Sequence, residues 1–208
     1  MAKRKDGEET QQRLLDVAGQ VFTEKGFHGA KVAQICRRAR CNVAAINYYF
    51  GSKEQLYVAV FRHAIEAGSD TWEAATSTGS PEQRLQEVIK QITGAFLGGK
   101  AGRFLRLYLM ELAHPTGLLD ETMRELLQPR RERTLMLIAE LLGPGASRQD
   151  VIFCEMSVIN QCRGFLMVNP EKIEWLLERP NTPELAAEVA DHIFRFSMAG
   201  IEAMRRRK

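Results

Sequence analysis

The chain has 208 residues, of which 45% are hydrophobic, and carries a formal net charge of +3, so it can bury a full core in one compact unit or in a small head on a larger body. No apolar run approaches the roughly 20 residues that a membrane-spanning helix needs, and the first residues are charged and polar instead of an apolar signal core. We therefore expect neither a membrane-spanning nor an exported protein. We expect a soluble, cytoplasmic protein with no membrane partner.

The first predicted helices lie close together at the start of the chain. One runs from about residue 10 to residue 25, where apolar residues recur at helical spacing, and Gly26 provides a C-terminal stop. Two short helices follow over residues 31–39 and 42–49, separated by a tight turn, and Asn42 is a good N-cap for the second. Two short helices of this kind, flanked by longer ones, predict a helix-turn-helix.

Capping signals mark the later helices. Ser52–Gln55 forms a capping box at the start of a long fourth helix, which we expect to join the two parts of the chain. Ser80 and Thr182 each precede a proline and open further helices. Residues 104–112 are apolar on nearly all sides, which predicts a helix at the heart of the second part. Because alternating runs of strand-forming residues are absent, the fold should be all-α with about nine helices.

The predicted elements divide the chain into two domains with different charge. Residues 8–68 form a three-helix head with a helix-turn-helix, and residues 69–208 form a helical-bundle body. Residues 1–53 hold ten Lys and Arg against five Asp and Glu, whereas the rest of the chain holds nineteen against twenty-one. Positive charge at one end is typical of a head that binds a polyanion, although a solvated basic face is the alternative.

The second short helix is predicted to enter the DNA major groove with its N-terminal residues facing the base edges. Asn42 and Asn47 can donate hydrogen bonds to bases and accept them, while Ile46 is the inward anchor. Between them lie small side chains that permit close approach and contact with thymine methyl groups: Val43, Ala44 and Ala45.

Four further residues are predicted to contact the DNA backbone. Tyr48 and Tyr49 are adjacent, so only one can face the core, and we expect Tyr48 to point outward. Lys53 lies in the first turn of its helix, where the helix dipole disfavours a cation unless an anion such as phosphate lies in front. Lys31 can make the matching contact across the groove. The alternative is that all four are ordinary surface groups of a small bundle.

A family resemblance is carried by the residues from Gly26 to Leu56. Gly26–Ala30, Val32, Ile35, Asn42 and Ile46, followed by the specific ending Tyr48–Glu54, resemble the N-terminal signature of TetR-family transcriptional regulators. The stretch Asn42–Tyr49 resembles the CecR (also called YbiH) subgroup in particular, and the body matches it more faintly. The resemblance implies a homodimer that reads a palindromic double-stranded DNA operator, with a small-molecule effector of unknown identity that forces the heads apart.

Two positions depart from the family pattern. Ala30 and Lys31 stand where Thr or Ser commonly caps the second helix, which puts that cap contact in doubt. Arg40 and Cys41 stand where Gly and Val usually form the turn. Arg40 therefore needs a costly left-handed backbone, or its side chain adds a phosphate contact.

The body suggests a role but no defined site. In the family the last two long helices form an intermolecular four-helix bundle, and here their apolar stripes suit either that dimer or an intramolecular core. Polar residues within apolar stretches, such as Glu111, Asn160 and Gln161, can orient an effector or simply lie at the surface, so the effector site stays unknown.

Other classes of protein have weaker support. The chain lacks a glycine-rich phosphate loop, a GxSxG elbow and an HExxH motif, so we expect no enzyme, no catalytic residue and no cofactor. Its four cysteines form no CxxC pair, so we expect reduced thiols and no metal site. An architectural DNA protein is a second alternative, but so large a body exceeds what DNA coating requires.

Overall fold

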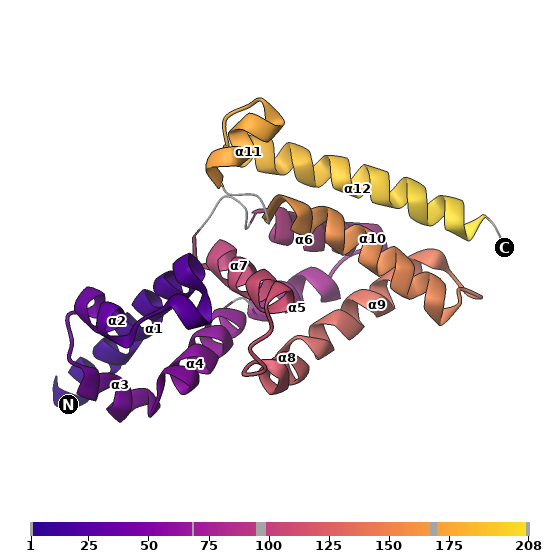
Figure 1. Cartoon of the computed structure of the whole chain (residues 1–208). Coiled ribbons are helices and arrows are strands. Elements are labelled where there is room, and N and C mark those ends of the chain that lie inside the picture. Colours follow the sequence, from indigo (N-terminus) through magenta and orange to yellow (C-terminus); the bar gives the residue numbers. More distant parts are fainter. Residues whose placement is uncertain (1, 68, 95–98, 167–169, 207–208) are drawn as a thin grey trace. The chain divides into compact units, whose positions relative to one another are not determined.

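The computed structural model describes residues 2–67, 69–94, 99–166 and 170–206. Every regular element in these ranges is a helix (Figure 1), which confirms the all-α class. The described ranges hold twelve helices, so the expectation of about nine was wrong. The helix over Ser69–Ser77 was not predicted as a separate element. It has nine residues, and so short a helix is hard to separate from a loop by its periodicity.

The chain folds into two compact units that do not follow chain order. The first unit holds residues up to Ala67 together with Arg103–Leu126. Its helices are α1 (Ala2–Gly29), α2 (Val32–Ala39), α3 (Val43–Phe50), α4 (Lys53–Glu66), α7 (Gly99–Ala113) from Arg103 onward, and α8 (Asp120–Leu126). The second unit contains α5 (Ser69–Ser77), α6 (Pro81–Gly94), α9 (Gln128–Leu142), α10 (Arg148–Leu166), α11 (Pro170–Leu177) and α12 (Pro183–Arg205).

The placement of α7 corrects the expectation that residues 104–112 lie at the heart of the body. These residues belong to the first unit, where they contact α1 and α4. Leu107 and Glu111 are buried there, whereas Leu112 is 49% exposed. Apolar residues on nearly all sides of α7 therefore did not mean that the helix is buried on all sides. The division into functional domains at residues 8–68 and 69–208 stays a prediction.

Helix α1 bends at Gly26, where the sequence predicted a stop. Gly26 has φ 67° and ψ 175°, a backbone that side chains with a Cβ rarely adopt, and helical turns resume after it up to Gly29. A Cβ at this position would lie 3.4 Å from the Cε of Met110 on α7. The bend therefore combines a positive φ with close packing in the first unit. The helix begins at Ala2, earlier than predicted.

The core of the first unit centres on Tyr57 of α4. Its ring lies 4.9 Å from that of Phe22 and 5.1 Å from that of Phe27, both on α1, measured between ring centroids. Its hydroxyl donates a 2.9 Å hydrogen bond to Oε2 of Glu111 on α7. Only 2% of Tyr57 and 4% of Glu111 is exposed to solvent. One side chain thus joins α1, α4 and α7.

The other carboxyl oxygen of Glu111 is also paired. Oε1 accepts a 2.7 Å hydrogen bond from the backbone N–H of Thr116 and a 2.8 Å bond from its hydroxyl. Both oxygens of this buried side chain therefore have donors, as a buried carboxylate requires. Burial, followed by the bond to Glu111, raises the pKa of the Tyr57 hydroxyl well above its ordinary value.

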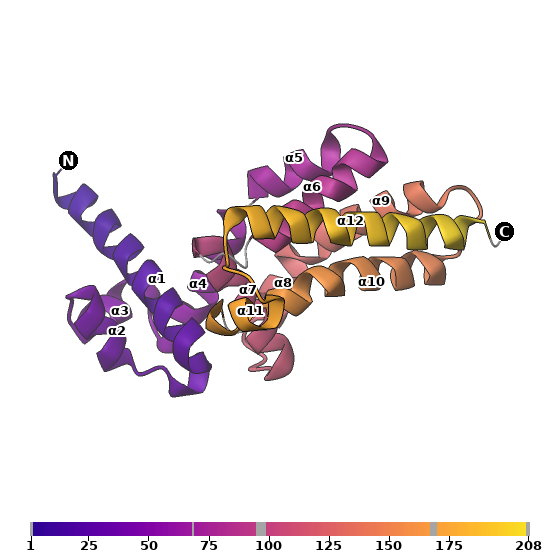
Figure 2. The ribbon, with the colours of Figure 1, turned by 90° about the horizontal axis from the view of Figure 1, so that it is seen from above.

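The second unit is a bundle in which α12 packs on α6, and α10 contacts α6, α9 and α12. Figure 2 shows α12 lying along α10. Most of the apolar stripes predicted for α10 and α12, including Val158, Cys162 and Ile193, are buried within this bundle, whereas Phe196 of the predicted α12 stripe is 64% exposed. The predicted cap of α12 is present, since the hydroxyl of Thr182 accepts a 3.3 Å hydrogen bond from the N–H of Leu185.

Replacing Tyr57 with Phe keeps the ring and removes one donor to the buried carboxyl of Glu111. We expect Tyr57→Phe to lower the free energy of unfolding at pH 7 by about 1.5–3 kcal/mol, the usual contribution of a hydrogen bond to a charged group. Tyr48→Phe is the matched control, because Tyr48 is 83% exposed and its replacement should leave stability unchanged. Urea denaturation of the three proteins measures these differences.

The same three proteins should differ in their response to alkaline pH. The pKa of Tyr57 is raised in the folded chain, so its contribution is fully present below the unfolded tyrosine pKa of about 10. Above that pH the unfolded chain loses the proton first, and the contribution disappears as pH rises toward the folded pKa. Between roughly pH 9 and pH 11, which brackets the unfolded tyrosine pKa, wild type should therefore lose more stability than Tyr57→Phe. Parallel losses would contradict this role of the hydroxyl.

Candidate nucleic-acid interface

The turn between α2 and α3 has the hydrogen bonding of a Schellman motif. Arg40 has φ 53° and ψ 45°, the left-handed backbone anticipated from its place in the sequence. Its N–H donates a 3.3 Å bond to the carbonyl of Arg37, and the N–H of Cys41 donates a 3.0 Å bond to that of Cys36. These two bonds satisfy carbonyls at the end of α2 and reverse the chain.

Helix α3 is fixed by a local cap and one buried side chain. Asn42 is the N-cap, and its side-chain oxygen accepts a 3.0 Å hydrogen bond from the N–H of Ala45. Ile46 is 1% exposed and is the predicted inward anchor. Because residues of a helix alternate between faces with a period of 3.6, burial of Ile46 turns the opposite side of α3 outward.

The predicted base-reading residues lie mostly on this outward side. Asn42, Ala44 and Asn47 are exposed, and Val43 is 47% exposed, whereas Ala45 is half-buried. Small side chains and amides thus share an exposed surface that can come close to the edges of base pairs. The orientation fits the geometry of a recognition helix.

The two adjacent tyrosines take different positions, as predicted. Tyr48 is 83% exposed and points outward. Tyr49 is half-buried, and its hydroxyl lies 3.4 Å from the position of a Cβ built on Gly7 of α1. Their rings meet edge to face at 4.9 Å between centroids. Tyr49 therefore packs between Tyr48 and the start of α1, which restricts the freedom of the exposed ring.

The two predicted lysines are placed differently. Lys31 is exposed at the N-cap position of α2, and its side chain makes no capping bond, which agrees with the doubtful cap. Lys53 is half-buried at the first position of α4, and its Nζ lies 4.4 Å from the centroid of the Phe27 ring. This cation–π contact stabilises a cation at the start of α4 without any phosphate, so it is a second explanation for a lysine at this position.

Among the other basic residues near the turn, only Arg40 was considered as a phosphate contact, as the alternative to a costly left-handed backbone. Arg37 is exposed in the last turn of α2, and Arg40 is exposed in the turn itself. Two more arginines serve the fold: Arg13 donates a 2.9 Å bond to the carbonyl of Ala39, and Arg38 pairs with Glu24 at 2.9 Å. The count of charged residues identified the basic head. It could not distinguish the arginines that bond within the fold from those whose side chains are exposed.

In the part of the chain that the structure describes, no cluster of three or more His, Cys, Asp or Glu side chains could hold a metal ion. None of the helices among the described residues is long and apolar enough to cross a membrane.

Two family models match the chain, one on each part. Residues 14–60 match the family described as bacterial regulatory proteins, tetR family. Residues 81–201, more than half of the chain, match the C-terminal domain of the HTH-type transcriptional dual regulator CecR. The chain belongs to the TetR family. Its body is of the CecR type, as the sequence of α3 and the fainter match of the body had indicated.

Similarity to individual TetR-family proteins is limited to part of the chain. The HTH-type transcriptional repressor NicS of Pseudomonas putida is 36% identical over 89 residues, which is 42% of this chain and 42% of NicS. The alignment therefore spans less than half of that relative, and it does not carry the activity or effector of NicS to this chain.

Solved structures of TetR-type regulators share the fold over most of the chain. FadR of Bacillus subtilis, solved in complex with stearoyl-CoA, has a TM-score of 0.69 at 15% identity and covers 91% of this chain and 98% of that one. The ketosteroid regulator KstR2 of Mycobacterium tuberculosis has a TM-score of 0.69 at 16% identity, covering 91% and 93%. At these identities the likeness shows the fold alone.

The left-handed backbone of Arg40 predicts a stabilising substitution. Arg40→Gly should raise the free energy of unfolding by about 0.5–1 kcal/mol, because glycine adopts a positive φ without steric cost. Arg37→Gly removes the same charge from inside α2 and should lower stability by about 1 kcal/mol. Thermal denaturation of both variants checks the pair. A destabilised Arg40→Gly would mean that the arginine side chain contributes more than its backbone costs.

Proposed function

We propose that this chain is a ligand-responsive repressor that binds a palindromic double-stranded DNA operator as a homodimer. The observation that carries the proposal is the orientation of α3 in a member of the TetR family. Its buried side holds Ile46, and its accessible side carries small residues, amides and an exposed tyrosine. A helix of this width, preceded by a basic helix and turn, fits the major groove.

The residues of α3 divide by the DNA groups they would contact. Asn47 can pair with the edge of a base through both its amide groups, and Val43 and Ala44 can contact thymine methyl groups. Asn42 uses its side-chain oxygen for the cap, so only its NH₂ group is free to donate to a base. Sequence preference should therefore depend most on Asn47 and the small residues around it.

Backbone contacts would surround this surface. Tyr48 on α3 and Lys31 at the N-cap of α2 are exposed, and Tyr49 supports the ring of Tyr48. The ammonium of Lys53 contacts the face of the Phe27 ring. To bind a phosphate it must either leave this ring or contact the ring and the phosphate together. Contacts of this kind set the register of the protein on DNA and provide most of the salt-dependent affinity.

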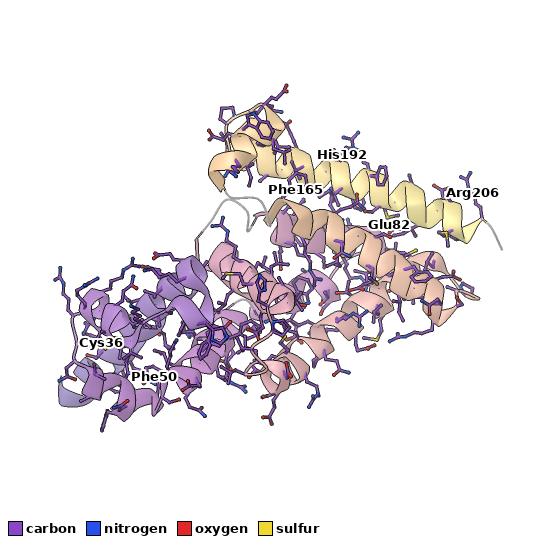
Figure 3. The ribbon with its side chains drawn as sticks, viewed as in Figure 1. Cys36, Phe50, Glu82, Phe165, His192 and Arg206 are labelled. Carbon is purple, nitrogen blue, oxygen red and sulfur yellow. The ribbon has the colours of Figure 1, made fainter. Side chains whose placement is uncertain are left out.

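The proposed dimer uses side chains that the single chain leaves exposed. On α10, Phe153 is 56% and Met156 48% exposed, and on α12, Phe196 is 64% exposed. The ring of Phe196 stacks on that of His192, which Figure 3 labels on α12, with centroids 6.2 Å apart. These three side chains stay exposed after the rest of the apolar stripes on α10 and α12 has been buried in the second unit. A second copy, as the family implies, would cover them and form a four-helix bundle.

Control by an effector requires two arrangements of the dimer. The heads fit successive major grooves in one arrangement, and the effector binds the other more tightly, which shifts the population away from DNA. The effector site is expected in the body and is assigned to no particular residues. Its ligand is a small molecule of unknown identity, because the fold is shared by regulators with different ligands.

Selection from a random duplex pool tests the proposal. The full chain is incubated with the pool at near-physiological salt, and bound sequences are recovered over several rounds. We expect an enriched palindrome whose half-sites lie about one helical turn apart, 10–10.5 base pairs from centre to centre. No enrichment from a pool that the protein binds would show a non-specific polyanion-binding head and would reject a sequence-specific repressor.

Lys53 and Asn47 should affect DNA binding in different ways. Lys53→Ala should weaken binding to every duplex and reduce the salt slope by about 1, whereas Asn47→Ala should change the preference among sequences. Lys172→Ala is the control for Lys53, because it removes one charge from an exposed position on α11. Fluorescence anisotropy over a range of salt concentrations measures each slope. Unaltered slope and preference in both variants would remove these residues from the interface.

An acidic side chain on the proposed dimer face should separate the two copies. Phe196→Glu places a charge in an apolar contact, so we expect a monomer at concentrations where wild type is dimeric. Trp175→Glu makes the same exchange at an aromatic residue that is 80% exposed on α11, and it should stay dimeric. Sedimentation velocity distinguishes the states. A dimeric Phe196→Glu would place the dimer contact elsewhere.

A further inference from the structure

Two of the four cysteines lie at the turn between α2 and α3. None of the four is joined in a disulfide. Cys36, Cys154 and Cys162 are buried, whereas Cys41 is partly exposed and is the most accessible. Cys36 lies in the last part of α2 (Figure 3), and Cys41 directly precedes the N-cap residue of α3.

The backbone of the turn brings these two side chains together. In a Schellman motif the residue that donates the longer-range bond commonly makes an apolar contact with the residue that accepts it. Here Cys41 donates this bond to Cys36 at 3.0 Å, so two thiols occupy the positions of the usual apolar pair. The Cys41 thiol is close enough to Cys36 to help raise its pKa.

The two thiols differ in reactivity. Burial in the first place, and the neighbouring Cys41 in the second, raise the pKa of Cys36 to about 11. Cys36 is therefore a protonated thiol at neutral pH. Cys41 is more accessible, and the turn beside it carries the exposed Arg40. Because reaction with peroxides follows access and thiolate character, Cys41 is the thiol that reacts first.

We propose that Cys36 and Cys41 are a redox-sensitive thiol pair, which a hydroperoxide oxidises to a disulfide, and that this disulfide weakens DNA binding by α3. The thiol chemistry stands by itself, whereas the effect on DNA rests on the proposed function.

Oxidation proceeds in two steps. The Cys41 thiol first releases its proton to water, and the sulfur of the resulting thiolate attacks one peroxide oxygen. The O–O bond breaks, and the leaving oxygen takes a proton back from water, so the products are a Cys41 sulfenic acid and water or an alcohol. The Cys36 sulfur then attacks the Cys41 sulfur, the S–O bond breaks, and the leaving hydroxide takes the Cys36 proton to form water. The two thiols lose two electrons, which reduce one hydroperoxide.

The disulfide would act on α3 through its first residues. A disulfide holds its two sulfur atoms about 2.05 Å apart with a restricted dihedral angle, so forming one at this contact must move Cys41 or Cys36. Cys36 is a buried residue within α2, so it is held in place. Cys41 adjoins Asn42, whose side chain caps α3. Movement of Cys41 therefore displaces the cap and the first turn, where the predicted base contacts lie.

Peptide mapping tests the thiol chemistry without DNA. The full chain is treated with hydrogen peroxide, its remaining thiols are alkylated, and it is digested with trypsin without reduction. Trypsin cuts after Lys31, Arg37, Arg40 and Lys53, so Cys36 and Cys41 fall in separate peptides, residues 32–37 and 41–53. We expect these two peptides joined by a disulfide that reducing agent removes. Separate alkylated peptides, or Cys41 linked only to a second chain, would overturn the proposal.

DNA binding of the same samples tests the consequence. The probe is a duplex selected by the reduced protein from a random pool, and oxidation should weaken its binding by about tenfold or more, comparable to loss of one base contact. Cys41→Val keeps an apolar contact in the turn and should bind equally before and after peroxide. Cys154→Ala leaves the pair intact and should respond like wild type.

The outcomes separate the two proposals. A mapped disulfide with unchanged DNA affinity would overturn the switch and leave the proposed function standing. Failure to select any duplex would reject the proposed function, while the mapping experiment would still decide whether the pair forms. Equal loss of binding in peroxide-treated Cys41→Val would assign the effect to another residue and overturn the role of this pair.

Discussion

The buried hydrogen bond between the Tyr57 hydroxyl and the Glu111 carboxyl is the constraint on which the first unit depends. Tyr57 lies about one turn from the start of α4, which follows α3 after only Gly51 and Ser52. Its ring also packs against aromatic residues of α1. The position of α3 is therefore set from α4, and α4 is held to α7 by a polar contact that costs energy whenever one partner is left alone.

The same bond limits how the first unit can rearrange. Glu111 lies on the part of α7 from Arg103 onward, in the same compact unit as Tyr57. A satisfied buried pair has few intermediate geometries, which favours discrete arrangements of this unit over gradual change.

Local features of the head could be predicted from sequence because the responsible groups are near neighbours. The Asn42 cap joins atoms three residues apart, and the left-handed backbone of Arg40 follows from its place after a helix. Tyr57 and Glu111 are 54 residues apart, and no periodicity links them. The stripes of α10 and α12 were found, but a single sequence does not show that Phe153 and Phe196 stay exposed after the core has formed.

Specific recognition of a palindrome by two copies is measured most directly by titrating the full chain onto two labelled duplexes in the analytical ultracentrifuge. One duplex carries the selected palindrome, and the other has the same base composition with both half-sites scrambled, at near-physiological salt. We expect two chains per palindrome and an affinity for the scrambled duplex that is weaker by about 10³-fold or more. Equal affinities would show binding by charge alone and would contradict a sequence-specific regulator.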